Sequence, residues 1–531
     1  MSEAQGPNIA EWQAQQQHQE AASEKSGFGL GHSDSVATIV DGMKWMFNFH
    51  EGAIAAYNNV FEGLVSGSSL VTLFGKSGNM FGIKFLESLA EYFSGGGGED
   101  MPSEGMGMDY GDEGHHPDDY PHASNEMAHS ADGLHDMHDA VKKVSVLGST
   151  GSIGKKTVDL LLKRKEEYQV EALSANSNFA LLAQQANLLN AKYAAISDER
   201  FYKDLKEDLL GTNVKVEVGA PGLANVASLH VDLSVIAIVG IAGLEPVIKV
   251  IESGTKVIAL ANKESIVCGG KLLLKKAKER SVQIIPIDSE HNAIFQVLQN
   301  DDKCVEKIIL TASGGPFLNY SLEQLRNITV NQALSHPTWK MGKKISVDSA
   351  TMMNKALEII EAHHLFKISP NRIEAVVHPE SIVHGVVVYQ DGFSFAVLAE
   401  TDMEISIAYA LSWPERSTLN YKLDLTKQKK LTFQEPDHKC FSSLKLSMEV
   451  LNSSSPHTNS IVLNAANEIA VNEFLKSRIG FLEVVEVVKS TIENFDKYSD
   501  INSLSDIISV DFESRIIANK IIENKGIRSA E

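Results

Sequence analysis

The sequence has few cysteines. Only Cys268, Cys304 and Cys440 occur in 531 residues, and no two of them form a CxxC pair. A disulfide-stabilised secreted domain or a cysteine-rich zinc site needs more cysteines at closer spacing. We therefore expect a reduced, cytoplasmic protein.

The sequence also shows no pattern typical of a targeting peptide or a membrane-spanning segment. The amino-terminal residues form no basic stretch followed by an apolar one, and the first arginine is Arg164, which argues against signal and transit peptides. The longest uncharged run in the apolar part of residues 1–140 covers 13 residues, 63–75. A bilayer span needs about 20 apolar residues, so we expect no membrane span.

Positive charge is scarce in the first part of the chain. Residues 1–140 hold 22 acidic residues against 4 lysines, whereas the remaining 391 residues hold 47 acidic and 44 basic residues. Most of the net charge of −21 therefore belongs to this extension. The body is nearly neutral, which argues against a nucleic-acid-binding surface.

The extension divides by composition. Residues 36–93 contain enough apolar and aromatic residues for a small helical module. Residues 99–140 contain 12 acidic residues and 6 histidines without one lysine or arginine. Such a run cannot bury enough apolar surface to fold, so we expect it to be disordered. Metal binding by its histidines is the alternative, and any partner of the extension is unknown.

Beyond the extension, apolar runs alternate with helical stretches. The runs 144–147, 170–173, 233–239, 257–260 and 282–287 predict buried strands of a doubly wound parallel sheet. The runs 305–310 and 375–388 predict strands of a second sheet. After residue 444 the pattern is helical to the end. The fold class is therefore α/β.

A glycine-rich turn follows the first predicted strand. GSTGSIG, residues 148–154, lets the backbone approach a pyrophosphate while the following helix offers free N–H groups. The spacing is GxxGxxG rather than GxGxxG, so a plain strand-to-helix turn is the alternative. Asn176, Ser177 and Asn178 follow the second strand. The lack of an acidic residue there favours NADP over NAD.

Carboxylates follow the strand at 282–287. In an extended segment, residues two apart face the same side, so Asp288 and Glu290 should converge beyond the carboxyl end of the strand. Two convergent carboxylates favour a hard divalent cation, Mg²⁺ or Mn²⁺. A turn rich in helix-capping residues is the alternative, with equal weight.

A helix predicted within residues 336–366 favours the cation site over the turn rich in capping residues. It places Asn354, Lys355 and Glu358 within about one turn of each other. A surface ion pair is the alternative, but much of this helix is apolar and should be buried. Buried polar groups need partners, and a bound anion together with a metal ion would supply them.

Several motifs together resemble one enzyme family. They are GSTGSIG (148–154), ANKES (261–265), DSEHNAIFQ (288–296), SGGPF (313–317), HPTWKMGKKISVDSATMMNKALEIIEA (336–362) and LNAANEIAV (463–471). They resemble 1-deoxy-D-xylulose 5-phosphate reductoisomerases, over about residues 142–531. The resemblance implies a homodimer that converts this sugar phosphate to 2-C-methyl-D-erythritol 4-phosphate with NADPH and Mg²⁺ or Mn²⁺, in non-mevalonate isoprenoid biosynthesis.

The resemblance also implies a domain order. Behind the extension at 1–140, a Rossmann-like NADPH-binding domain would cover 141–287. An α+β catalytic domain would cover 288–430, and a C-terminal helical bundle would cover 431–531.

The resemblance assigns roles to individual residues. The metal ligands would be Asp288, Glu290 and Glu358. Catalytic and substrate-binding residues would be Lys263, Ser289, Glu290, Ser313, His336, Ser349, Asn354, Lys355 and Glu358. Cofactor-binding residues would be Thr150, Gly151, Ser152, Ile153, Asn176, Ser177, Asn178, Asn262, Glu264 and Gly342. Trp339 and Met341 would belong to a lid. Many members have a lysine where this chain has Ser177, so we expect a reduced preference for NADPH.

Two other classes of function stay open. A plain NADP-dependent semialdehyde or hydroxy-acid dehydrogenase would share the glycine-rich turn but would not need three carboxylates or a metal. An adaptor with an inactive body would use the acidic extension to recruit a partner. The presence of every polar residue expected of the family argues against the adaptor.

Overall fold

The computed structural model describes residues 141–298, 304–339, 341–496 and 500–525. All of them belong to one compact unit. The helical module predicted at 36–93 and the disorder predicted at 99–140 lie outside the described residues. Among the helices of the described ranges, none combines the length and the apolar character that a bilayer crossing requires.

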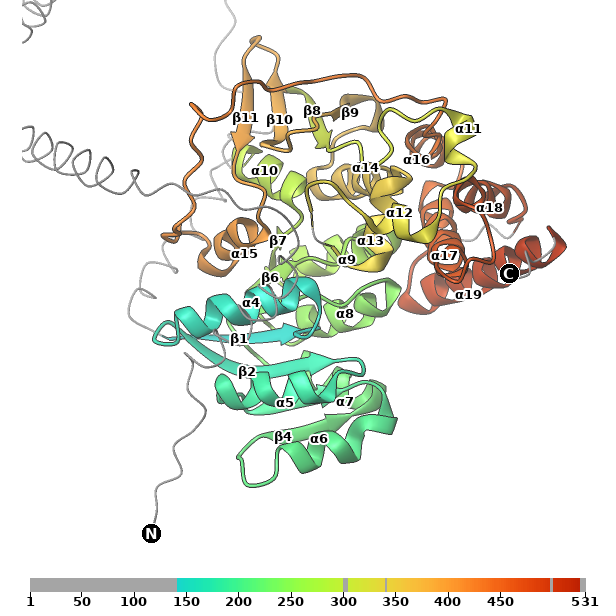
Figure 1. Cartoon of the computed structure of the whole chain (residues 1–531). Helices are drawn as coiled ribbons and strands as arrows, with labels where there is room; N and C mark the ends of the chain where they lie inside the picture. The colour runs from blue at the N-terminus through green and yellow to red at the C-terminus, as the bar shows by residue number, and fades with distance from the viewer. Residues whose placement is uncertain (1–140, 299–303, 340, 497–499, 526–531) are drawn as a thin grey trace, which may run out of the picture. The chain divides into compact units, whose positions relative to one another are not determined.

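A seven-stranded parallel sheet forms the first part of this unit (Figure 1). Its strands are β1 (Lys142–Leu147), β2 (Tyr168–Ala175), β3 (Tyr193–Ile196), β4 (Lys215–Val218), β5 (Leu233–Ile236), β6 (Val257–Leu260) and β7 (Gln283–Pro286), in the order β4-β3-β2-β1-β5-β6-β7. Strand β1 lies between β2 and β5, so the direction of winding reverses there. Ligands of open parallel sheets bind at such a switch point, beyond the carboxyl ends of the strands.

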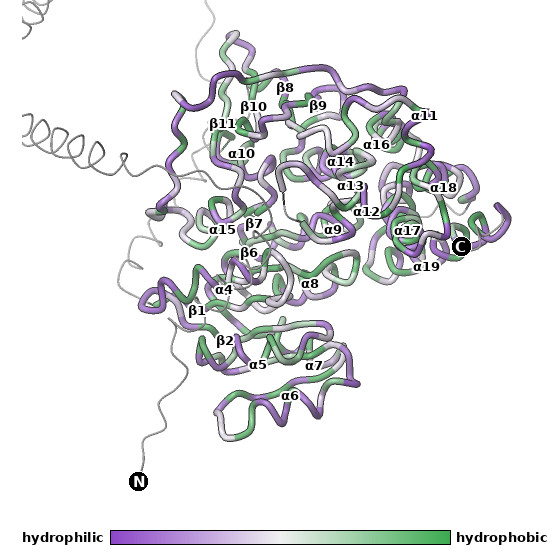
Figure 2. Tube along the Cα trace, in the orientation of Figure 1, coloured by the Kyte–Doolittle hydropathy of each residue, from purple (hydrophilic) through white to green (hydrophobic). Residues whose placement is uncertain are grey.

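Helices cover both faces of this sheet, which confirms the doubly wound prediction. They are α4 (Ser152–Lys163), α5 (Phe179–Leu188), α6 (Tyr202–Asp208), α7 (Gly219–Ala227), α8 (Leu244–Glu252) and α9 (Lys263–Glu279), with short 3₁₀ turns η3 (Glu199–Phe201) and η4 (Ile241–Gly243). One apolar core joins the sheet to α7, α8 and α9. The other joins it to α4, α5, α6 and α15 (Met403–Ser412). Figure 2 shows hydrophobic residues along the strands and hydrophilic ones on outer turns.

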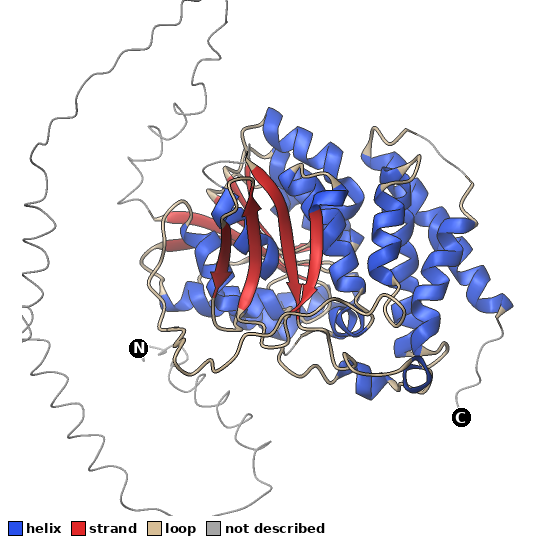
Figure 3. Ribbon diagram, turned by 90° about the horizontal axis from the view of Figure 1, so that it is seen from above, coloured by secondary structure: helices blue, strands red, loops and turns tan. Residues whose placement is uncertain are grey.

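A second sheet has four strands, β8 (Val305–Ala312), β9 (Ile373–Val377), β10 (Val383–Tyr389) and β11 (Ser394–Leu398), in the order β11-β10-β8-β9. Helices α10 (Ser289–Leu298) and α14 (Met353–Phe366) pack against it. Figure 3 shows these strands side by side with helices behind them. The segments α11 (Leu322–Leu325), α12 (Val330–Leu334), α13 (Lys343–Ala350) and η5 (Pro370–Arg372) lie in the connection between β8 and β9.

The last part of the unit is helical, as predicted. It consists of α16 (Ser443–Leu451), α17 (Pro456–Leu475), α18 (Phe481–Glu493) and α19 (Leu504–Asn524). Helix α17 begins with Pro456, which suits a first helical position because it lacks an N–H group. It packs against α9 and α13, so the C-terminal helices support two elements that carry site residues.

Some strand predictions were wrong. The run 233–239 is a strand only to Ile236, because residues 237–240 turn against the glycine-rich loop. The run 375–388 contains two strands, which a turn at 378–382 separates. The short strands β3, β4 and β11 were not predicted. The domain boundaries at 287 and 430 remain predictions.

Candidate active site

The glycine-rich turn lies at the switch point of the sheet, directly after β1. Gly148 has φ +92°, and a Cβ atom there would lie 2.6 Å from the Ala237 carbonyl oxygen. A Cβ atom at Gly154 would overlap the Gly148 carbonyl, so α4 packs backbone against backbone on the turn. The N–H groups of Ser152 and Ile153, in the first turn of α4, have no intrahelical acceptors. The turn therefore fits a pyrophosphate.

Neighbouring elements hold this turn in place. The backbone N–H groups of Gly148 and Ser149 donate to the Ser174 carbonyl at 3.1 and 2.8 Å. The Ser149 hydroxyl donates to Gln185 Oε1 at 2.7 Å, and Gln185 Nε2 donates to the Ser149 carbonyl at 3.0 Å. These buried bonds fix the turn against β2 and α5 before any ligand binds.

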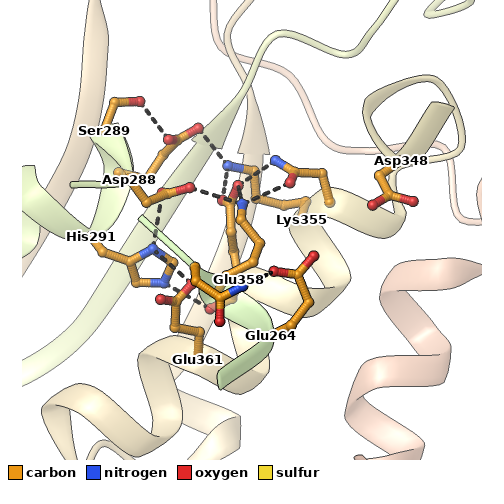
Figure 4. A network of polar contacts seen from close by, with 12 residues as sticks. Glu264, Asp288, Ser289, His291, Asp348, Lys355, Glu358 and Glu361 are labelled. Carbon is orange, nitrogen blue, oxygen red and sulfur yellow. Dashed lines mark hydrogen bonds and ion pairs between the residues drawn. The ribbon is translucent and has the colours of Figure 1, made fainter. Parts of the chain in front are cut away.

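Three carboxylates lie close together beyond the carboxyl end of β7, and Figure 4 labels two of them, Asp288 and Glu358. Asp288, Glu290 and Glu358 each place one oxygen within 4.8 Å of the others. The predicted extended geometry was wrong, because α10 begins at Ser289 and the Asn292 N–H already donates to the Asp288 carbonyl at 2.8 Å. The start of a helix, rather than strand alternation, brings the first two carboxylates together.

Two lysines neutralise these carboxylates. The Lys263 Nζ atom lies 2.8 Å from Asp288 Oδ2 and 3.1 Å from Glu358 Oε1. The Lys355 Nζ atom lies 2.7 Å from Glu290 Oε1 and also contacts Glu358. Three hard oxygen donors suit Mg²⁺ or Mn²⁺.

Burial and charge act against each other in this cluster. Burial alone would raise the pKa of Asp288, but attraction to Lys263 and His291 holds that pKa well below its ordinary value. Burial would lower the pKa of Lys263, but Asp288 and Glu358 raise it well above its ordinary value. Burial raises the pKa of Glu358, and repulsion from Asp288 and Glu290 raises it further.

His291 supports the cluster from behind, a role that the sequence analysis did not assign. Its Nδ1 atom lies 2.9 Å from Asp288 Oδ1, and its Nε2 atom lies 3.0 Å from the Glu358 carbonyl oxygen. The Glu361 carboxylate is 3.5 Å from Nδ1, so it contributes charge rather than a short hydrogen bond. The ring is fully buried and links α10 to α14. Its position inside the DSEHN stretch was the available signal.

A second polar group joins the loop after β8 to the segment after α12. His336 Nδ1 accepts hydrogen bonds from the backbone N–H groups of Thr338 and Trp339 at 3.2 and 2.9 Å. The ring proton therefore lies on Nε2, which donates to Ser313 Oγ at 3.0 Å. Burial lowers the pKa of His336, so the ring is neutral. Ser313 Oγ also accepts from Gly315 N at 3.2 Å, which leaves its own proton for a bound anion.

One cavity of about 430 Å³ brings most predicted site residues together. Its wall includes Ser152, Ile153, Lys263, Asp288, Ser289, Glu290, Ser313, His336, Trp339, Met341, Gly342, Ser349, Asn354, Lys355 and Glu358. The predicted residues outside this wall are Thr150, Gly151, Asn176, Ser177, Asn178, Asn262 and Glu264. The substrate and metal residues therefore share one space, whereas most of the cofactor residues lie along the carboxyl edge of the sheet.

Two predicted cofactor residues are occupied by protein contacts. Asn262 Nδ2 donates to the carbonyl oxygens of Ile238 and Gly240, each at 2.8 Å. Glu264 Oε1 pairs with Lys344 Nζ at 2.7 Å. These side chains shape the loops after β5 and β6, and their contact with a cofactor remains a prediction.

The cavity wall also contains residues that the sequence analysis missed. Lys156 Nζ pairs with Asp402 Oδ1 at 2.9 Å and links α4 to α15, which lie side by side in Figure 1. The His384 ring packs edge-on against Trp339, with ring centroids 6.3 Å apart. His384 Nε2 is buried and has no hydrogen-bond partner among the described residues. Neither an isolated lysine nor a histidine within a strand gives a recognisable sequence signal.

Comparison with known proteins gives a consistent result. Family models match residues 144–270 (1-deoxy-D-xylulose 5-phosphate reductoisomerase), 284–366 (its C-terminal domain) and 398–517 (DXP reductoisomerase C-terminal domain). The enzyme of that name from Wolbachia pipientis (strain wPip) is 98% identical over 391 residues, 74% of this chain and 100% of the relative. The one from Ehrlichia ruminantium (strain Welgevonden) is 52% identical over 72% of this chain and 99% of the relative.

Solved structures agree. The reductoisomerase from Zymomonas mobilis in complex with NADPH has a TM-score of 0.68 at 42% identity, covering 72% of this chain and 100% of that one. A DOX-P reductoisomerase in complex with NADPH, fosmidomycin and magnesium has a TM-score of 0.69 at 38% identity, covering 73% and 100%.

Proposed function

The chain belongs to the 1-deoxy-D-xylulose 5-phosphate reductoisomerase family, and from this premise we propose that it rearranges and reduces that sugar phosphate. The product is 2-C-methyl-D-erythritol 4-phosphate, an isoprenoid precursor of the non-mevalonate pathway. The observation that carries this function is the cluster of Asp288, Glu290 and Glu358, which shares one cavity with the first turn of α4.

The three carboxylates are our proposed ligands for Mg²⁺ or Mn²⁺. The donor set fits such an ion, because it consists of hard oxygens on three separate side chains. An ion held by these three residues would act as a Lewis acid on the ketone and the adjacent hydroxyl of the substrate. His291 then holds Asp288 in one orientation through the 2.9 Å contact, so the ligand set is arranged in advance.

The phosphate of the substrate is assigned to polar groups that line the same cavity as the carboxylates. The Ser313 hydroxyl oxygen accepts from His336 Nε2 and from Gly315 N, which fixes its position. Its own proton can then be donated to the phosphate. Ser349, Asn354 and Lys355 line the same cavity and add a hydroxyl, an amide and a charge. Lys263 lines this cavity as well and donates to Asn354 Oδ1 at 2.7 Å, which supports assigning both lysines to substrate binding.

NADPH is assigned to the carboxyl edge of the parallel sheet. Its pyrophosphate would lie on the turn 150–153, and the nicotinamide would reach the cavity past Ser152 and Ile153. NADPH supplies the hydride that reduces the aldehyde formed by the rearrangement. Trp339 and Met341 line the same cavity next to Gly342, and we assign them to a lid that would exclude water from the substrate.

The test measures NADPH oxidation by the full chain with 1-deoxy-D-xylulose 5-phosphate, before and after metal removal by a chelator. We expect activity with Mg²⁺ or Mn²⁺, loss with the chelator and recovery when the ion is restored. A plain semialdehyde or hydroxy-acid dehydrogenase would keep its activity in the chelator. Reduction of NADP⁺ with a hydroxy acid or a semialdehyde, without added metal, would favour that alternative.

A homodimer and a cytoplasmic location remain parts of the proposal. The outer strand β11 supports the dimer, because within the described ranges no further strand pairs with its outer edge. Phe393 and Phe395 on and beside it are 69% and 54% exposed. Exposed aromatic side chains on an edge strand are typical of interfaces. Light scattering of the purified chain measures the oligomeric state directly.

A further inference from the structure

The carboxyl ends of β2 and β3 lie side by side at the edge of the parallel sheet. The backbones run side by side there, since Ser197 N donates to the Ala175 carbonyl and Asp198 N donates to the Asn176 carbonyl, each at 2.9 Å. The residues after β2 are exposed and neutral, and Asn178 caps α5 through a 3.2 Å bond to Leu181 N. These residues alone give a 2′-phosphate no positive charge.

A positively charged side chain, Arg200, lies after the neighbouring strand β3. Arg200 follows β3, and its guanidinium group lies over the Phe201 ring, 5.8 Å from the centroid. The Phe201 ring stacks on Phe179 at 5.6 Å, and Phe179 directly follows the cap residue Asn178. This stack places Arg200 beside the loop after β2, although 21 or more residues separate the two in sequence.

Asp198 binds two of the three nitrogens of the Arg200 guanidinium group. Its Nε atom donates to Asp198 Oδ1 at 2.9 Å and its Nη2 atom to Asp198 Oδ2 at 2.5 Å. The Nη1 atom has no acceptor within the described part of the chain, and the side chain is 82% exposed. The other nearby acid, Glu199, leans toward Gly219 at the start of α7. Asp198 therefore fixes the orientation of the guanidinium group, and Nη1 remains available to donate to a ligand.

We propose that Arg200 binds the 2′-phosphate of NADPH and supplies the charge that Ser177 does not. The assignment rests on the proposed function, and it names a specificity-determining residue for its cofactor. In NADP-binding domains of this type, an arginine near the ribose accommodates the 2′-phosphate. Arg200 follows β3 and lies next to the loop after β2. A guanidinium fork also matches the geometry of phosphate oxygens.

Two lysines on α4 are the rival cations. Lys156 is engaged with Asp402 at 2.9 Å. Lys155 is exposed in the first turns of α4, next to the turn that is assigned to the pyrophosphate. Lys155 would strengthen binding of NADPH and NADH alike, because both cofactors carry the pyrophosphate. Only a group at the 2′ position distinguishes the two.

The test measures binding to the full chain without substrate, by fluorescence titration of NADPH and of NADH. Arg200→Ala should weaken NADPH about tenfold, the size expected of one exposed charge-assisted contact, and leave NADH within about twofold. Arg200→Lys should restore part of the loss. Lys203→Ala removes an exposed cation on the adjacent α6 and should change neither constant. Adenosine 2′,5′-bisphosphate should compete less well against Arg200→Ala than against the unaltered chain.

Equal losses for NADPH and NADH would overturn the assignment, since they would show that Arg200 only supports the fold of the loop. A selective loss in Lys155→Ala with none in Arg200→Ala would overturn it as well. In both cases turnover of the sugar phosphate by the unaltered chain would leave the proposed function intact. A chain that binds neither cofactor would overturn both.

Discussion

Replacing Gly148 with alanine tests how the glycine-rich turn is built. The residue has φ +92°, a conformation that costs a residue with a Cβ atom about 1–2 kcal/mol. The new methyl group would also lie 2.6 Å from the Ala237 carbonyl oxygen and 2.9 Å from the Ile238 nitrogen. Backbone atoms cannot move aside as a side chain can, so overpacking adds about 1–3 kcal/mol. We expect a total loss of about 2–5 kcal/mol in the free energy of unfolding.

Gly211 supplies a matched control. It has φ +82°, but a Cβ atom there would meet nothing within 4 Å. Gly211→Ala should therefore lose only the conformational part, about 1–2 kcal/mol. Urea unfolding followed by circular dichroism measures both variants, and NADPH titration should show weaker binding for Gly148→Ala alone. Equal stability of the two variants would refute the claim that the turn packs tightly against the β5 loop.

Four further predictions concern the site. Glu290→Gln and Glu358→Gln should each remove most turnover at modest metal concentration while circular dichroism stays unchanged; near-normal turnover would show that the metal site is misplaced. Ser177→Lys should lower the Michaelis constant for NADPH, and a native preference for NADH would contradict this expectation. Trp339→Ala should impair substrate use with only a small stability loss, because the ring is half-buried; a loss of about 3–5 kcal/mol would make it a core residue. Burial lowers the pKa of His336, so the neutral ring stabilises the folded chain at pH values above its ordinary pKa of about 6.5. This stabilisation of the fold is lost as the pH falls and the ring is protonated. The Michaelis constant for substrate should rise in that acid range, as protonated Nδ1 can no longer accept from Trp339; a flat profile would contradict the assigned tautomer.

The sequence predicted the parallel sheet well because its central strands are apolar on both faces. Strand β5 is fully buried, and β1 is buried from Val144 to Leu147, so a largely apolar run was enough. Strand β4, Lys215–Val218, lies at the edge of the sheet and mixes charged with apolar residues. Four residues of mixed character are too few for a periodic pattern, which explains why it was missed.

The site was predictable in its residue types but less so in its geometry. Motif resemblance named Asp288, Glu290 and Glu358, and the structure brings their oxygens together. The sequence did not show that α10 starts at Ser289, that His291 contacts Asp288, or that Arg200 lies beside the loop after β2. Those facts depend on contacts between elements far apart in the chain, such as Nε2 of His291 with the Glu358 carbonyl.

The central claim is most directly tested by identifying the product by NMR after incubating the full chain with 1-deoxy-D-xylulose 5-phosphate, NADPH and Mg²⁺. The account predicts one molecule of 2-C-methyl-D-erythritol 4-phosphate for each NADPH oxidised, and no product once a chelator removes the metal. Oxidation of NADPH without this product, or formation of the product at an unchanged rate in the chelator, would contradict the account.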